Sequence, residues 1–128
     1  MNLAQLLVRA ARTAGSRPAV YLGTTPLLDY PGLAHRAATL AGKLQSQYGL
    51  QPGARVALFM SNHPAVLEIL FGCWWAGLVV VPINPKLHPR EAGYILGHSG
   101  ASLAFVTDDI GPALAGETPA PPSLRDIV

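Results

Sequence analysis

The sequence predicts an α/β fold: a partial doubly wound sheet with a βαβαβ core, preceded by an N-terminal helix and a β-hairpin. The first observation is a set of three apolar runs, near residues 55–60, 78–82 and 102–106, each with the length of a strand buried on both faces. The second is that the segments between these runs have the apolar periodicity of helices, and helical crossovers let strands pair in parallel. The expected core therefore alternates strand and helix from residue 55 to residue 107.

An amphipathic helix is predicted at the start of the chain. Its apolar residues recur at intervals of three and four, which places them on one helical face. These residues are Leu3, Leu6, Leu7, Ala10 and Ala14. Asn2 is expected to cap the helix, and Gly15 and Pro18 end it.

A β-hairpin is predicted next, although its turn contains the letters of a phosphate-binding loop. Residues 23–26 read Gly-Thr-Thr-Pro, and glycine with threonine is typical of loops that cradle phosphate. However, Pro26 lacks a backbone donor, and no lysine follows before Lys43. The flanking runs Ala19–Leu22 and Leu27–Tyr30 are mostly apolar, which is typical of two strands around a tight turn.

A longer helix follows the hairpin. Apolar residues form a stripe over about four turns. They are Leu33, Ala37, Leu40, Ala41, Leu44 and Tyr48. Asp29 is expected to cap this helix, Pro31 is tolerated in its first turn, and Gly49 ends it.

Two crossover helices complete the predicted core. Ser61–Asn62 is expected to cap the first of them, which has Pro64 in its first turn. The second begins near Pro89, and either His88 or Asn84 is expected to cap it. Prolines at such a crossover restrict the unfolded chain and so stiffen the turn.

The pattern predicts one N-terminal subdomain, residues 1–109, and a loosely structured tail rich in proline and glycine, residues 110–128. In doubly wound folds, ligands sit beyond the carboxyl ends of the strands. Here the three strand ends are expected at Ser61–Asn62, Ile83–Asn84 and Thr107–Asp108.

Composition narrows the classes of function. The chain is 50% hydrophobic and 12% charged with a net charge of +2, so it lacks the basic surface that nucleic-acid binding requires. No apolar run reaches the ~18 residues of a membrane span. The one cysteine, Cys73, excludes an internal disulfide, and we expect it to be a small buried apolar side chain in a cytoplasmic, reducing setting. A chain this apolar, with open sheet edges, is expected to form a homo-oligomer through an edge or an apolar face.

Three motifs resemble those of a known family. Residues 52–57 read Pro-Gly-Ala-Arg-Val-Ala, residues 62–64 read Asn-His-Pro, and residues 76–84 read Ala-Gly-Leu-Val-Val-Val-Pro-Ile-Asn. With them, residues 1–109 resemble the N-terminal part of the AMP-forming acyl-CoA synthetases, the adenylate-forming ligases, of the fatty-acid or long-chain type. Their Thr-Tyr-x-Glu-Leu helix entry is similar to residues 29–33, although Asp29 replaces the threonine and Gly32 the glutamate, so only half of a capping box remains.

The resemblance implies an activity for a full-length enzyme. Such ligases convert a carboxylate, ATP and CoA into acyl-CoA, AMP and pyrophosphate, and they use ATP, Mg²⁺ and CoA. Their ATP loop reads roughly Ser/Thr-Ser-Gly-Thr-Thr-Gly-x-Pro-Lys-Gly, and neither that loop nor the later catalytic lysine occurs in these 128 residues. The chain is therefore expected to be a structural N-terminal piece that binds no cofactor and has no catalytic residue of its own. Its expected partner is the remainder of the ligase chain.

Lys86 is the one candidate site residue. In synthetases of this type a basic residue in the corresponding turn can approach the phosphates of CoA, and the resemblance gives that role to Lys86. The alternative is an ordinary solvated turn lysine. The four histidines have no metal-binding spacing, so no metal site is expected. The alternative function for the whole chain is a free-standing flavodoxin-like interaction module without catalysis.

Overall fold

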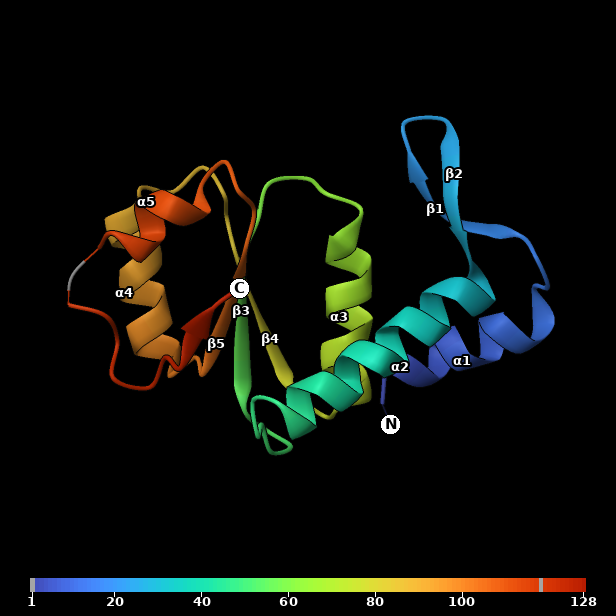
Figure 1. Ribbon diagram of the computed structural model, residues 1–128, viewed down its shortest axis with the longest axis horizontal. Helices are drawn as coiled ribbons and strands as arrows, with labels where there is room; N and C mark the ends of the chain where they lie inside the picture. The colour runs from blue at the N-terminus through green and yellow to red at the C-terminus, as the bar shows by residue number, and fades with distance from the viewer. Residues whose placement is uncertain (1, 118) are drawn as a thin grey trace. The chain divides into compact units, whose positions relative to one another are not determined.

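A computed structural model describes residues 2–117 and 119–128 of the chain, which divide into two compact units (Figure 1). The first unit contains the residues up to Pro52 together with Pro64–Leu78, and the second contains Gly53–His63 and Val79–Val128. The chain therefore passes from one unit to the other and back before it completes the second.

The first unit is a layer of three helices with a two-stranded hairpin. Its elements are α1 (Ala4–Thr13), β1 (Pro18–Leu22), β2 (Thr25–Asp29), α2 (Tyr30–Ser46) and α3 (Ala65–Trp75). In Figure 1, α1 runs beside α2, and the hairpin projects from one end of this pair. Buried residues of α1, β1 and α2 form its core: Leu7, Val20, Leu33, Ala34 and Ala37.

Helices α2 and α3 pack closely because one of them carries a glycine at the contact. A Cβ atom at Gly72 would lie 2.8 Å from Cδ2 of Leu40, closer than real Cβ atoms come. The next residue, Cys73, is fully buried, as expected of a small apolar side chain. Burial raises the pKa of the Cys73 thiol to about 12, which leaves it protonated and unreactive at neutral pH.

The predicted hairpin is confirmed. Strands β1 and β2 pair antiparallel, and Leu22 faces Thr25 across a turn made by Gly23 and Thr24. Gly23 has φ +60°, a conformation that glycine adopts without strain. Of the Gly-Thr-Thr-Pro stretch, the first two residues therefore form the turn and the last two begin β2.

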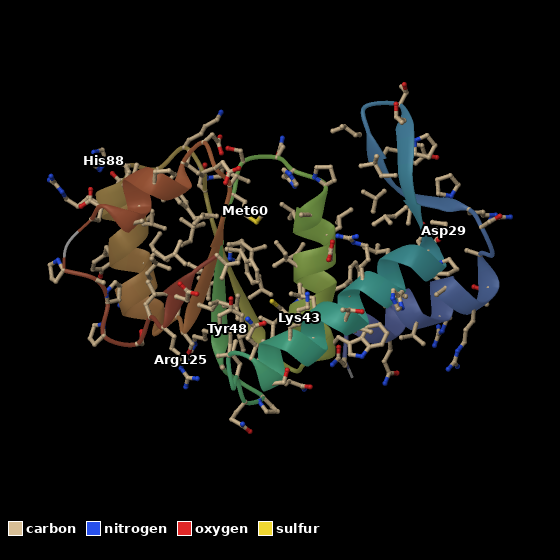
Figure 2. All side chains as sticks on the ribbon, viewed as in Figure 1. Asp29, Lys43, Tyr48, Met60, His88 and Arg125 are labelled. Atoms are coloured by element: carbon tan, nitrogen blue, oxygen red, sulfur yellow. The ribbon has the colours of Figure 1, made fainter. Side chains whose placement is uncertain are left out.

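The cap of α2 is also confirmed. The Asp29 carboxylate accepts a hydrogen bond from the Gly32 backbone N–H at 2.7 Å, and Asp29 lies where the hairpin meets the helix (Figure 2). The interaction satisfies one of the free donors of the first helical turn.

The second unit is a parallel sheet with two helices. Its elements are β3 (Arg55–Phe59), β4 (Val79–Ile83), α4 (Pro89–Ser99), β5 (Leu103–Val106), α5 (Gly111–Ala115) and β6 (Asp126–Ile127). The strand order is β4-β3-β5-β6, and all pairs are parallel. Side chains of β3 are buried on both faces, Val56 and Leu58 on one and Ala57 and Phe59 on the other, as the apolar run predicted.

The core of this unit lies between the sheet and its two helices. Side chains from β3, β4 and β5 meet side chains from α4 and α5 in one cluster. The cluster contains Ala57, Phe59, Ile83, Ala92, Leu96, Ala101, Ala104 and Leu114. Among the residues that the structure describes, no helix is long and apolar enough to cross a membrane.

The segment 110–128 differs from the loose tail that its composition predicted. It contains α5 and β6, and β6 pairs with β5. Val128 closes this pairing, since its N–H donates to the Ala104 carbonyl at 2.8 Å and its carbonyl accepts from the Val106 N–H at 3.0 Å. The physical reason is that the free edge of β5 presents backbone donors and acceptors that need partners, whatever side chains the partner carries.

We predict that Leu114→Ala lowers the free energy of unfolding by about 2–3 kcal/mol, because the substitution removes a buried side chain and leaves a cavity. Leu114 is only 3% exposed. The measurement is urea denaturation followed by circular dichroism. Ala115→Ser, at an exposed position on the same short helix, is the matched control and should change stability by less than about 0.5 kcal/mol. Equal effects of the two substitutions would mean that this segment is not packed on the sheet.

Candidate functional site

The carboxyl ends of β3, β4 and β5 meet at one edge of the second unit, because parallel strands all point the same way. We call the three segments that follow these strands, residues 60–62, 84–86 and 107–109, the carboxyl edge. Figure 2 shows Met60 at the end of β3 and His88 at the start of α4. This is where ligands sit in open α/β sheets.

The seam between β3 and β5 is the point at which the topology changes direction. From β3 the chain continues to β4 on one side, and it then returns to β5 on the other side of β3. Crossovers that depart in opposite directions leave a space beyond the strand ends, which makes this seam the favoured binding position in the fold class.

A hydrogen-bonded network closes this seam. The Ser61 backbone N–H donates to Oγ1 of Thr107 at 3.1 Å. The Ser61 hydroxyl donates to Oδ2 of Asp109 at 2.5 Å. The hydrogen bond from the Ser61 side chain, followed by one from the Thr107 side chain, holds the pKa of Asp109 below its ordinary value. Asp109 is thus a stable, exposed carboxylate fixed to the end of the neighbouring strand.

Ser61 therefore has a different role from the one the sequence predicted. The sequence predicts that Ser61–Asn62 caps the first crossover helix, but α3 begins at Ala65 with Pro64 in the cap position. A capping oxygen bonds to an N–H two or three residues further along, and Ser61 lies too far before this helix to do so. Its hydroxyl is instead used across the seam.

The turn after β4 holds Lys86 by its backbone. Oδ1 of Asn84 accepts a hydrogen bond from the Lys86 N–H at 2.9 Å, so the turn is fixed without the Lys86 side chain, which is exposed. The expected cap of α4 is His88, whose Nδ1 accepts from the Arg90 N–H at 3.1 Å. Hydrogen bonds to the Asn84 and His88 side chains thus hold the backbone of this turn, and the Lys86 side chain is exposed to solvent.

The carboxyl edge offers polar and charged groups of both signs. The Ser61 hydroxyl donates to the Asp109 carboxylate, and this hydrogen bond ties the ends of β3 and β5 together. Asp108 and Asp109 add two negative charges beside the single positive charge of Lys86. Within residues 2–117 and 119–128, no three His, Cys, Asp or Glu side chains lie close enough together to hold a metal ion.

The sequence predicts the position of the carboxyl edge but not the role of Asp109 in it. The strand ends were predicted correctly as Ser61–Asn62 and Thr107–Asp108. The composition places Asp109 just before the predicted tail, although a Thr-Asp-Asp run directly after a buried strand is itself a signal of a polar strand end. The hydrogen bond between Ser61 and Asp109 joins residues 48 positions apart in the chain, so no local sequence pattern predicts it.

We predict that Ser61→Ala raises the pKa of Asp109 toward that of an ordinary aspartate, because the carboxylate loses its first hydrogen-bond donor. A depressed pKa in the folded state stabilises the protein above about pH 4, and that stability is lost as the pH falls through the folded-state pKa. Wild type should therefore lose more stability than Ser61→Ala between about pH 5 and pH 3.

The measurement is an NMR titration of the Asp109 carboxyl carbon. Ser46→Ala is the matched control, since the Ser46 hydroxyl bonds to the Gly42 carbonyl in the other unit, and it should leave the Asp109 titration unchanged. An Asp109 pKa that stays low in Ser61→Ala would show that other groups depress it.

Comparison with known proteins gives a consistent result. Residues 7–127 match the family described as AMP-binding enzyme. Feruloyl-CoA synthase from Amycolatopsis sp. is 44% identical over 102 residues, which are 80% of this chain and 20% of that protein. A long-chain-fatty-acid–CoA ligase from Salmonella typhimurium is 33% identical over 113 residues, 88% of this chain and 20% of that one.

A solved structure shares the fold. The N-terminal domain of FACL13 from Mycobacterium tuberculosis superposes with a TM-score of 0.89 over 100% of this chain and 33% of that chain, at 24% identity. The chain thus spans about a fifth of the length of the curated relatives that it matches.

Proposed function

Because this chain belongs to the family of AMP-binding enzymes, we propose that it forms the N-terminal part of an adenylate-forming ligase that makes acyl-CoA from a carboxylate, ATP and CoA. The observation that carries the proposal is the 44% identity with a CoA synthase across 80% of this chain, which a shared fold alone does not require. One of these relatives is named for a feruloyl group and the other for a long-chain fatty acid, and a carboxylate of one of these two kinds is the proposed substrate.

The role of these residues in the proposed ligase is structural. The family's glycine-rich phosphate loop with its lysine is absent from the sequence, and the carboxyl edge offers two carboxylates and one lysine. Stabilisation of a transferring phosphoryl or adenylyl group requires converging positive charge and backbone donors. We therefore assign the binding of ATP, Mg²⁺ and CoA to other segments of a longer chain, and that longer chain is the proposed partner of these residues.

The sheet has an edge available for such a partner. Among the described strands, β4 is paired only with β3, and its Val79 is 45% exposed. A strand edge of this kind pairs with further chain or with a second copy, although Pro82 removes one of its donors and so limits the ladder.

We predict that the 128-residue chain alone makes no acyl-adenylate. The test is to incubate it with ATP, Mg²⁺ and either ferulate or a long-chain fatty acid, and to follow the release of pyrophosphate. A full-length feruloyl-CoA synthase is the positive control for the assay. Turnover above a sample without protein would overturn the structural role.

The ligase proposal itself is tested on the coding DNA. Reading the frame beyond codon 128 should give a glycine-rich loop that contains a lysine, followed by the rest of an adenylate-forming enzyme. A frame that encodes an unrelated domain would overturn the proposal.

Lys86→Ala in the full-length ligase separates the two roles of this lysine. A contact with the phosphates of CoA would raise KM for CoA by roughly 3- to 30-fold and leave the adenylation half-reaction unchanged. A solvated turn lysine would change neither stability nor kinetics by more than about 0.5 kcal/mol. We expect the second result, because Asn84 fixes the turn without the help of the lysine side chain. The matched control is Arg17→Ala, which removes an exposed cation outside this turn.

A selective rise of KM for CoA in Lys86→Ala would contradict this expectation and place the turn in the thioester-forming site. Loss of adenylation as well would indicate damage to the fold rather than loss of a CoA contact.

A further inference from the structure

Helices α2 and α3 form an open groove on the surface of the first unit. The groove has a volume of about 270 Å³ and is lined by five residues of α2 and one of α3: His35, Arg36, Thr39, Leu40, Lys43 and Glu68. The lining residues of α2 recur at spacings of three and four, so they share one face of the helix. We call this feature the α2–α3 groove.

Two side chains of the groove are held in place by α3. Leu40 is half-buried and packs against α3 where Gly72 leaves room for it. The Arg36 Nε donates a hydrogen bond to Oε2 of Glu68 at 2.9 Å, and the Glu68 side chain is 19% exposed. This ion pair engages one nitrogen of the guanidinium, and the two terminal nitrogens remain for a further partner. Arg36 is thus oriented before any ligand arrives.

The first unit contains more cations than carboxylates. It has four arginines and one lysine, but the only carboxylate side chains in its sequence are Asp29 and Glu68. Asp29 caps α2 and Glu68 pairs with Arg36, so both are already engaged. Lys43, which Figure 2 shows on α2, forms no ion pair within the described residues. The groove therefore presents positive charge that an external anion can neutralise.

The spacing of the two cations indicates the kind of anion. Arg36 and Lys43 lie seven residues apart, which is about 10 Å along the helix axis. A carboxylate offers one anionic centre, whereas two linked phosphate groups offer two in one compact ligand. The planar guanidinium of arginine binds phosphate oxygens in pairs, and lysine binds phosphate as a point charge. A groove of this size admits a diphosphate but is small for a whole cofactor, whose pockets exceed about 300 Å³.

We propose that the α2–α3 groove binds a diphosphate group, with the terminal nitrogens of Arg36 on one phosphate and the Lys43 ammonium on the other. The diphosphate can be free pyrophosphate or part of a nucleoside diphosphate, since both present linked anionic centres. The proposal does not rest on the proposed ligase activity, because it concerns binding alone and every residue involved lies in the first unit.

The experiment is an NMR titration of the nitrogen-15-labelled 128-residue chain at low salt and without Mg²⁺. The probes are inorganic pyrophosphate, ADP and inorganic phosphate. Pyrophosphate should shift the backbone amide signals of residues 35–43 and 68 in a saturable way, and raising the salt concentration should weaken it. Inorganic phosphate should bind roughly five-fold more weakly, because it meets only one of the two cations. The tighter binder of pyrophosphate and ADP identifies the source of the diphosphate.

Three substitutions assign the contacts. Lys43→Gln should weaken pyrophosphate binding by up to about five-fold, as expected for one exposed ion pair. Arg36→Gln should weaken it more, by roughly 10-fold, because it removes the guanidinium and leaves the Glu68 carboxylate to repel the ligand. Glu68→Gln should instead tighten binding by about two- to five-fold, since the groove loses its lining carboxylate while glutamine can still accept a hydrogen bond from Arg36.

Arg17→Gln is the matched control. It removes one positive charge from the same unit, and Arg17 is exposed and does not line the groove. This variant should bind pyrophosphate like wild type, and circular dichroism should show that every variant is folded. The Glu68→Gln result is independent of any loss of folding, because a damaged fold would not tighten binding.

Three results would overturn the proposal. Unchanged or weaker binding in Glu68→Gln would show that the charge of the groove does not control the affinity. A loss in Arg17→Gln as large as that in Lys43→Gln would assign the binding to the charge of the whole unit. Inorganic phosphate that bound as tightly as pyrophosphate would show that the two cations do not act together on a diphosphate.

Discussion

The structure of the second unit depends on the parallel pairing of β3 with a neighbour on each side. Because β4 and β5 both align with β3, their carboxyl ends reach the same edge of the sheet, and Ser61 comes within hydrogen-bond distance of Asp109. The pairing also requires that β3 be apolar on both faces, and its four central side chains are at most 5% exposed. A polar residue within Val56–Phe59 would thus disturb both the core and the position of the edge.

The same constraint explains the organisation of the last segment. A parallel sheet that ended at β5 would leave a row of unpaired backbone groups on that strand. Two residues of β6 and the terminal Val128 meet this need with backbone hydrogen bonds, while Leu114 of α5 fills the core beside them. Gly111 permits this arrangement, since a Cβ at that position would come within 2.5 Å of Cγ2 of Val106.

The carboxyl edge shows how parallel strand pairing creates a position at which polar groups gather. The seam between β3 and β5 has the topology of a binding site, but its network consists of a hydroxyl that donates to a carboxylate and of a second hydroxyl. Such a network stabilises the strand ends and offers polar contacts to other chain segments. A supporting role in a longer ligase, as we propose for these residues, is compatible with membership in the family of AMP-binding enzymes.

Local patterns in the sequence determined the elements. The hairpin around Gly23, the Asp29 cap and the three main strands were predictable because each depends on residues that are close together in the chain: a positive φ at glycine, a carboxylate three residues before a free N–H, and short apolar runs. The family motifs could also be recognised without a structure, because each consists of contiguous residues.

Only the tertiary structure decided how distant residues are used. Ser61 looked like a helix cap but bonds to Asp109, and β6 lies in a segment whose proline and glycine content predicted a loop. The first helix is a third case, because its periodicity counts Leu3 and Leu6 among its apolar residues, while packing buries Leu7 and leaves these two exposed. In each case the outcome depends on which surface folding brings opposite the residue, and a sequence pattern does not encode the partner that lies across space.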